Sequence, residues 1–265
     1  MSVIPIMTVA LMITNPTVAH LKHINPKIFV GIGSALAVSG ALMTSQVHTF
    51  GQLLITFSLV SAIGFGCCYF PPLQCGWEWM PHKKGLTTGI ILGAFGFGAF
   101  VFSFLAVQIC NPDNASPTII APNGTKFYDA EIAGRVPTFF VWLAVCWACL
   151  GLFSTLVIKT NPDLLKSEDI TADEFERMLT VKESLRTRHF WKLICMDFFS
   201  IQTFLYMSSV YKTMALQIGT EDMDDRFITM IGAFGSICNG GSRVLAGYLM
   251  DRFEFKNIYS WLLAV

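Results

Sequence analysis

Apolar residues fall into long runs along the chain, and short polar segments separate these runs. A membrane-spanning helix needs about 20 mostly apolar residues. A shorter run, Val3–Val18, comes first, and Ile258–Val265 begins a last run that the chain end truncates. The pattern predicts an all-α integral membrane protein with about seven transmembrane helices and a truncated eighth. Six runs have the full length: Ile28–Val47, Phe50–Gly76, Leu86–Cys110, Val136–Ile158, Phe190–Gln217 and Phe227–Met250.

The first run, Val3–Val18, has two interpretations. An apolar N-terminal stretch could be a secretory signal peptide, which begins with basic residues and ends at a cleavage site flanked by small residues. No Lys or Arg precedes this run, and no convincing cleavage site follows it. We therefore predict a membrane helix.

Composition supports the membrane assignment. Hydrophobic residues make up 53% of the chain and charged residues only 14%, whereas a soluble domain carries about 25% charged residues. The formal net charge is zero, which excludes the basic surface expected of a nucleic-acid-binding protein. The expected surroundings are a lipid bilayer.

Lys and Arg are distributed unevenly between the loops. Thirteen lie on one side of the predicted membrane, and only Lys126, Arg135 and Arg226 lie on the other. Cytoplasmic loops carry an excess of these residues, so we expect the richer side to face the cytoplasm. N-glycosylation patterns at Asn114 and Asn123 fall on the opposite side. They favour the plasma membrane or an endomembrane over a mitochondrial membrane.

A polar stretch divides the predicted spans into two groups. Within it, Thr171-Ala-Asp-Glu174 has the pattern of a capping box, and apolar residues follow at helical spacing. We expect a short amphipathic helix here. The predicted organisation is an N-terminal half-bundle over 1–158, a cytoplasmic central loop over 159–189 and the start of a C-terminal half-bundle over 190–265.

No constellation for catalysis or for a resident cofactor is recognisable. The sequence lacks the HExxH, GxSxG and phosphate-loop patterns. Its five histidines lack metal-ligand spacing. We expect neither an enzyme nor a protein that holds a metal or cofactor.

One predicted span carries an arginine. Arg243 lies eight residues before Asp251, about 12 Å along a helix, and therefore near the middle of a bilayer core about 30 Å thick. Such an arginine faces the protein interior and is by default a functional residue. Asn239 is one turn earlier on the same face. The predicted role is to bind an anion.

A structural ion pair is the alternative for Arg243. Asp197 lies at a similar depth in the preceding predicted span and could pair with it. Three other polar side chains near mid-membrane, Gln202, Tyr206 and Tyr69, could line a cavity, although packing against aromatic neighbours is the favoured role for each.

Glycines form a pattern at the start of the third long run. Gly85, Gly89 and Gly93 recur every four residues and so share one helix face. Small residues at this spacing let another membrane helix approach closely, and the same packing role is expected of Gly247. We predict a helix contact rather than direct contact with a substrate.

Two stretches resemble transporter families. Gly247-Tyr-Leu-Met-Asp251-Arg252 and the following Lys256 are similar to a cytoplasmic loop signature of the major facilitator superfamily, although Glu254 replaces its second glycine. The corresponding early loop, Thr17–Lys27, has no acidic residue. The resemblance implies that Asp251 and Arg252 contact neighbouring helix ends and hold a gate.

The second stretch, Trp79-Met-Pro81-His-Lys83-Lys84-Gly85, resembles the oxalate/formate antiporter and monocarboxylate transporter families. This resemblance implies alternating-access transport of a small organic anion, as antiport or proton symport, with Arg243 holding the carboxylate. The chain would correspond to helices two to eight and the start of nine, out of twelve.

A different class of function remains open. The missing helices and the altered early loop would also suit a non-transporting membrane subunit or scaffold derived from a transporter. In that case a partner chain could supply further helices. Arg243 favours transport, because a scaffold has no need of a costly charge inside a span.

Overall fold

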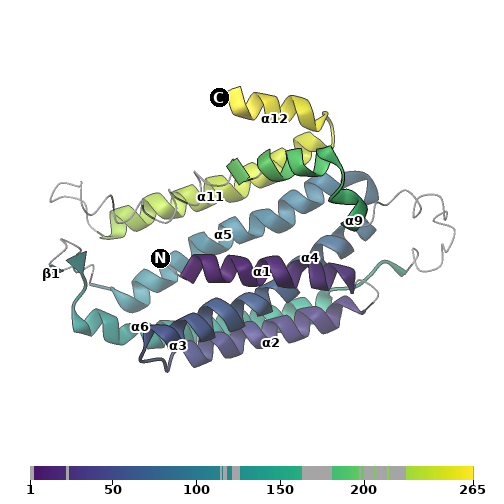
Figure 1. Cartoon of the computed structure of the whole chain (residues 1–265). Helices are drawn as coiled ribbons and strands as arrows, with labels where there is room; N and C mark the ends of the chain where they lie inside the picture. The colour runs from purple at the N-terminus through teal and green to yellow at the C-terminus, as the bar shows by residue number, and fades with distance from the viewer. Residues whose placement is uncertain are drawn as a thin grey trace. The chain divides into compact units, whose positions relative to one another are not determined.

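Helices dominate the described part of the chain (Figure 1). The computed structural model describes residues 3–21, 24–113, 115, 118–120, 126–162, 181–196, 198–199, 206, 210, 214 and 225–264. These residues fall in two compact units, one formed by residues 1–161 with 229–265 and the other by residues 162–228.

The helices of the first unit follow the predicted apolar runs closely. Strands occur, in the described part, as a two-residue antiparallel pair, β1 (Ile119–Ile120) and β2 (Lys126–Phe127). The helices are α1 (Val3–His20), α2 (Pro26–Thr44), α3 (Phe50–Leu53), the π-helix η1 (Leu54–Ser61), α4 (Ala62–Trp79), the 3₁₀-helix η2 (Pro81–Lys83), α5 (Lys84–Cys110), α6 (Ala130–Val157), α11 (Asp225–Met250) and α12 (Phe255–Ala264).

Five helical segments of the described chain are long and apolar enough to cross a membrane: Val3–His20, Pro26–Thr44, Phe50–Trp79, Pro81–Cys110 and Ala130–Val157. The all-helical membrane fold is thereby confirmed. The predicted span Phe227–Met250 forms α11, but this helix is not among the five, and it contains the polar residues Asn239 and Arg243. Most of the predicted span Phe190–Gln217 lies outside the described residues.

Polar side chains fix where several helices begin. The Asn25 side chain accepts a hydrogen bond from the Lys27 amide at 3.0 Å and caps α2. Thr49 and Gln52 form a capping box at α3. Asp129 accepts from the Ala130 amide at 2.6 Å and caps α6. Each cap satisfies an amide that the first turn of a helix leaves without a partner.

The first unit is held together around α2. This helix packs against α4 and α6, while α1 packs on α4 and α5 contacts both α4 and α6. Small residues set the distance between α2 and α4: a Cβ added at Gly64 would lie 2.6 Å from the Ala37 nitrogen. Backbone contact of this kind is how membrane helices gain close packing without a hydrophobic driving force.

The π-helix η1 interrupts the span Phe50–Trp79 and carries polar side chains into the packing. The Thr44 hydroxyl of α2 lies within hydrogen-bond distance of the Gly40 carbonyl, at 2.7 Å, and of the Thr56 hydroxyl of η1, at 2.9 Å. Ser58 and Ser61 are fully buried in η1. A π-helical turn is rare and is found mostly where a helix has a functional constraint.

Large apolar side chains cover the outside of the first unit. On α6, Leu152 and Phe153 are each 65% exposed and Leu156 is 64% exposed. Such a surface would drive aggregation in water, but it suits contact with lipid. Its position on a predicted span supports a multi-pass membrane protein.

The second unit contains α9 (Val181–Ser184) and the helical residues 188–196. The Trp191 indole donates to the Leu185 carbonyl at 2.9 Å and ties these segments together. Most of the predicted amphipathic helix that begins at Thr171 lies outside the described residues.

Candidate functional site

The arginine predicted at mid-membrane lies on α11, and it has a polar partner on the same helix. Arg243 Nε donates to Asn239 Oδ1 at 3.0 Å. Arg243 is exposed in the first unit. Among the described residues no carboxylate pairs with it and its two Nη groups have no hydrogen-bond partner. Asn239 therefore fixes the Nε edge of the guanidinium, and the two Nη groups form the opposite edge.

The other predicted cavity residues are distributed over both units. Tyr69 of α4 packs its ring against Phe95 of α5, with ring centroids 5.8 Å apart. Tyr206 belongs to the second unit and is 65% exposed. Gln202 and Asp197 lie outside the described residues, so the predicted ion pair between Asp197 and Arg243 stays a prediction.

Asp251 clamps the end of α11 to the start of α5. Its Oδ1 accepts from the Gly85 amide and its Oδ2 from the Leu86 amide, both at 2.7 Å. The first amides of a helix lack intrahelical partners and lie at the positive end of the helix dipole. A carboxylate that accepts from two of them makes a strong, charge-assisted contact.

Arg252 takes a different role from its neighbour. Its guanidinium carbon lies 4.6 Å from the ring centroid of Tyr248, on the preceding turn of α11. In the described chain it pairs with no carboxylate. Within the described residues, Asp251 contacts a neighbouring helix, whereas Arg252 contacts Tyr248 of its own helix.

Glycines bring α5 and α11 into backbone contact over the turns that follow this clamp. We call this contact the glycine seam; it consists of Gly85, Gly89, Gly93 and Gly96 of α5 with Gly240 and Gly247 of α11. A Cβ added at Gly89 would lie 2.5 Å from the Arg243 carbonyl oxygen, and one added at Gly96 would lie 2.6 Å from the Gly240 nitrogen. The two helices run side by side in Figure 1. The seam thus holds the backbone that carries Arg243.

Gly96 and Gly240 were not among the packing residues predicted from the sequence. Gly96 follows Gly93 by three residues, and Gly240 precedes Gly247 by seven. Both spacings return to the same helix face, so extending the search beyond a strict four-residue repeat would have found them.

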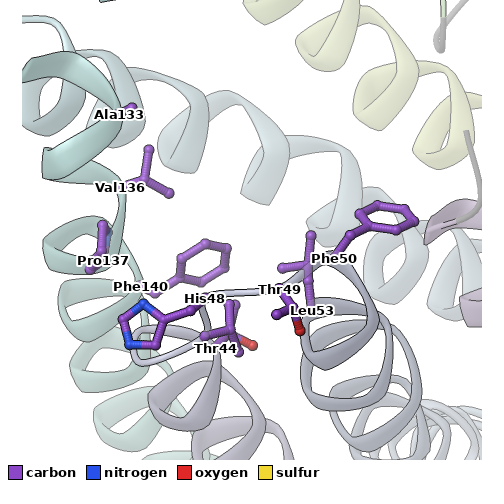
Figure 2. Close-up of a pocket in the computed structure, with 10 residues that line it drawn as sticks. Thr44, His48, Thr49, Phe50, Leu53, Ala133, Val136, Pro137 and Phe140 are labelled. Atoms are coloured by element: carbon purple, nitrogen blue, oxygen red, sulfur yellow. The ribbon is translucent and has the colours of Figure 1, made fainter. Parts of the chain in front are cut away.

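A separate pocket lies at the other end of the first unit. It has a volume of about 310 Å³, and its walls come from the end of α2, the following loop, α3 and α6. Figure 2 shows the imidazole of His48 beside Thr44, with Phe140 and Pro137 of α6 facing them. Apart from His48 and two threonines, its lining is apolar, so it offers little to hold an anion.

The predicted N-glycosylation patterns fall between α5 and α6 in the sequence. Asn114 and Asn123 lie outside the described residues. Just before Asn114, Asp113 pairs with Arg135 of α6 at 3.8 Å, and Arg135 also pairs with Glu131 of its own helix at 2.6 Å. In the part of the chain that the structure describes, no three metal-ligating side chains gather in one place.

Comparison with known proteins identifies one family. The sequence model of the Major Facilitator Superfamily matches residues 1–265. Apicoplast pyruvate carrier 1 of Toxoplasma gondii is 28% identical over 273 residues, covering 89% of this chain and 50% of the carrier. An uncharacterized MFS-type transporter, YhjX of Escherichia coli strain K12, is 24% identical over 216 residues, covering 80% of this chain and 47% of its own length.

A shorter similarity links the chain to human monocarboxylate transporter 12, which is 25% identical over 82 residues, covering 31% of this chain and 16% of that transporter. The chain spans about half the length of the first two relatives.

Proposed function

The chain belongs to the Major Facilitator Superfamily, and we propose that it takes part in moving a small monocarboxylate across a membrane by alternating access. The observation that carries this proposal is the arginine of α11, whose guanidinium is held by Asn239 at 3.0 Å. A guanidinium presents a fork of donors that matches the two oxygens of a carboxylate. With Nε occupied, the two Nη groups form that fork.

Two relatives support the choice of substrate class. One is described as a pyruvate carrier and another as a monocarboxylate transporter. Pyruvate is therefore the first substrate to test, followed by lactate, formate and oxalate. Each of these anions carries a carboxylate that Arg243 could bind in the same way.

The Asp251 clamp supplies a gate in this proposal. For the lysine-rich side to open, α5 and α11 must separate at the end where Asp251 accepts from the Gly85 and Leu86 amides. Those two hydrogen bonds then break and the glycine seam parts. The arrangement described above corresponds to closure on that side, and the opposite side gives access to Arg243.

The test is uptake of radiolabelled pyruvate by proteoliposomes that contain the full chain. Arg243→Ala and Arg243→Lys should both lower kcat/KM about tenfold or more, since charge-assisted hydrogen bonds are lost and lysine cannot restore the fork. Arg186→Ala is the matched control, because Arg186 is exposed in the second unit, outside the five apolar spans. Uptake by Arg243→Ala at the wild-type rate would contradict the proposal.

Variants of Asn239 test the orientation of the Arg243 guanidinium separately from its charge. Asn239→Leu should raise KM about fivefold, the effect of one lost hydrogen bond, and leave the arginine charge in place. Asn239→Asp should be worse, because its carboxylate would pair with the guanidinium and compete with the substrate. Equal uptake by Asn239→Asp and wild type would show that this edge of Arg243 has no part in binding.

The coupling mechanism needs its own measurement. Preloading the vesicles with unlabelled carboxylate accelerates uptake in an antiporter, whereas an inwardly directed proton gradient accelerates it in a proton symporter. Absence of uptake under every gradient would instead favour the non-transporting membrane subunit.

A further inference from the structure

A groove runs between α4 and α6, with α2 as its floor. We call it the α4–α6 groove. It consists of two cavities of about 350 Å³ and about 190 Å³ that share Val30, Pro72 and Ser154 in their walls. The larger cavity lies at the end that carries Trp79 and Lys159, and the smaller one extends inward to Phe65 and Trp147. The larger cavity alone is within the range of small-ligand sites, about 300–1,000 Å³, and the smaller one extends it inward.

The walls of the groove are apolar and belong to predicted spans. On α6, Leu150 is 56% exposed and Val157 is 59% exposed, and Trp79 at the end of α4 is 54% exposed. These side chains lie on helices long and apolar enough to cross a membrane. The groove therefore opens toward lipid, and an acyl chain is the occupant that its lining fits.

Two lysines stand at the mouth of the groove. Lys159 follows α6 and lines the larger cavity. Lys27 lies one turn before Val30, and its Nζ donates to the Leu156 carbonyl of α6 at 3.5 Å. Neither forms an ion pair with a described residue. Two amines beside an apolar groove at a membrane surface complement an anionic headgroup.

The nearby carboxylate is engaged elsewhere. Glu78 accepts from Gln74 Nε2 at 3.1 Å and from the Asn161 amide at 3.2 Å. The Trp79 indole donates to the Lys159 carbonyl at 3.0 Å, which fixes the backbone of Lys159 at the groove. Within the described residues neither lysine pairs with this carboxylate, so both amines can contact a ligand.

From this arrangement we propose that the α4–α6 groove binds an anionic phospholipid from the leaflet on the lysine-rich side. One acyl chain lies between α4 and α6, and the phosphate lies at Lys27 and Lys159. The proposal is independent of the transported substrate, because the groove and Arg243 lie on different helices.

The test uses the full chain in nanodiscs and lipids with brominated acyl chains, which quench tryptophan fluorescence on contact. Trp147 lines the inner cavity, so the signal is the part of the quenching that Trp147→Phe removes. Brominated phosphatidylglycerol should quench Trp147 at a mole fraction about 25-fold lower than brominated phosphatidylcholine, because two lysines each contribute about fivefold. Equal quenching by the two lipids would overturn the proposal.

Two variants locate the site. Lys27→Gln with Lys159→Gln should weaken the preference for phosphatidylglycerol about 25-fold, since each of the two lysines near an anionic surface contributes about fivefold. Lys83→Gln with Lys84→Gln removes the same charge from the same side, outside the groove lining, and should leave the preference unchanged. An equal loss in both pairs would show a diffuse surface effect and overturn the site.

Ser154→Phe tests the acyl chain separately. Ser154 is exposed and lines both cavities, so an aromatic ring there should fill the groove and abolish Trp147 quenching by either lipid. Circular dichroism and gel filtration would verify that this variant is folded. Retained quenching of Trp147 in a folded Ser154→Phe protein would exclude a chain in the groove.

Discussion

The glycine seam and the α4–α6 groove are two helix contacts within the same unit. At the seam the backbones of the two helices touch, whereas the groove leaves cavities between its helices. At the seam, glycines of α5 meet main-chain atoms of α11. Across the groove, Phe65 meets Trp147 edge to face, with ring centroids 5.0 Å apart, and the rings keep the helices separated. Both contacts are rich in apolar residues. Side-chain size, not hydrophobicity, therefore decides how closely these membrane helices approach.

The polar residues follow the same division. Asp251 and Arg243 belong to the helix that forms the seam, whereas the groove has lysines only at its mouth. Because the helix backbones touch at the seam, the hydrogen bonds of the Asp251 carboxylate at its end are held in a fixed geometry. A contact that leaves cavities can admit a lipid chain.

The largest expected effect comes from widening the seam. Gly89→Val should lower the free energy of unfolding by about 3 kcal/mol, the upper end of what over-packing costs, since even a Cβ there would lie 2.5 Å from the Arg243 carbonyl oxygen. Unfolding of the reconstituted protein in SDS would measure it. Gly98→Val, on the same helix with nothing within 4 Å of an added Cβ, is the control. Equal stability of the two variants would refute the seam.

A smaller effect is expected where the seam ends. Asp251→Asn should cost about 1.5 kcal/mol, because one charge at the α5 N-terminus and one of two hydrogen bonds are lost. The same SDS titration would measure it. Glu254→Gln is the matched control, since Glu254 is an exposed carboxylate three residues further along. A loss in both variants, or in neither, would contradict the clamp.

The smallest effect is expected in the groove. Ser154→Leu should change the free energy of unfolding by no more than about 0.5 kcal/mol, as for exposed positions in general, because Ser154 borders the cavities. The substitution adds side-chain volume to the α4–α6 groove, where the helices already leave cavities. A loss of the size expected for Gly89→Val would mean that the groove is packed as tightly as the seam.

Runs of apolar residues predicted the membrane helices well, but not where each begins. Helix α6 starts at Ala130, six residues before the apolar run that begins at Val136, because Asp129 caps it and Glu131 pairs with Arg135 in its first turns. The π-helix Leu54–Ser61 was not predicted. It depends on which carbonyl each amide reaches, and no residue type specifies that choice.

Of the candidate site, the sequence predicted only the contacts that depend on the spacing of residues within one helix. The interval of four between Asn239 and Arg243 puts them on one face of α11, and there they form a hydrogen bond. The repeat of Gly85 and Gly89 predicted a close helix contact, but a repeat on one helix cannot identify the partner. That α11 is the partner depends on tertiary packing between residues far apart in the sequence, as the hydrogen bond from Gly85 to Asp251 illustrates.

The seam also constrains how the sequence can change over evolutionary time. Every substitution of a glycine adds atoms, and at Gly85, Gly89 and Gly93 the closest atoms that these would meet are carbonyl oxygens of α11. These oxygens belong to the backbone, so no second substitution on α11 can remove them. A side-chain change at the facing position of α11 therefore cannot compensate for the loss of a seam glycine. Suppressors of a seam mutation should instead arise elsewhere, at residues that let one helix move as a whole.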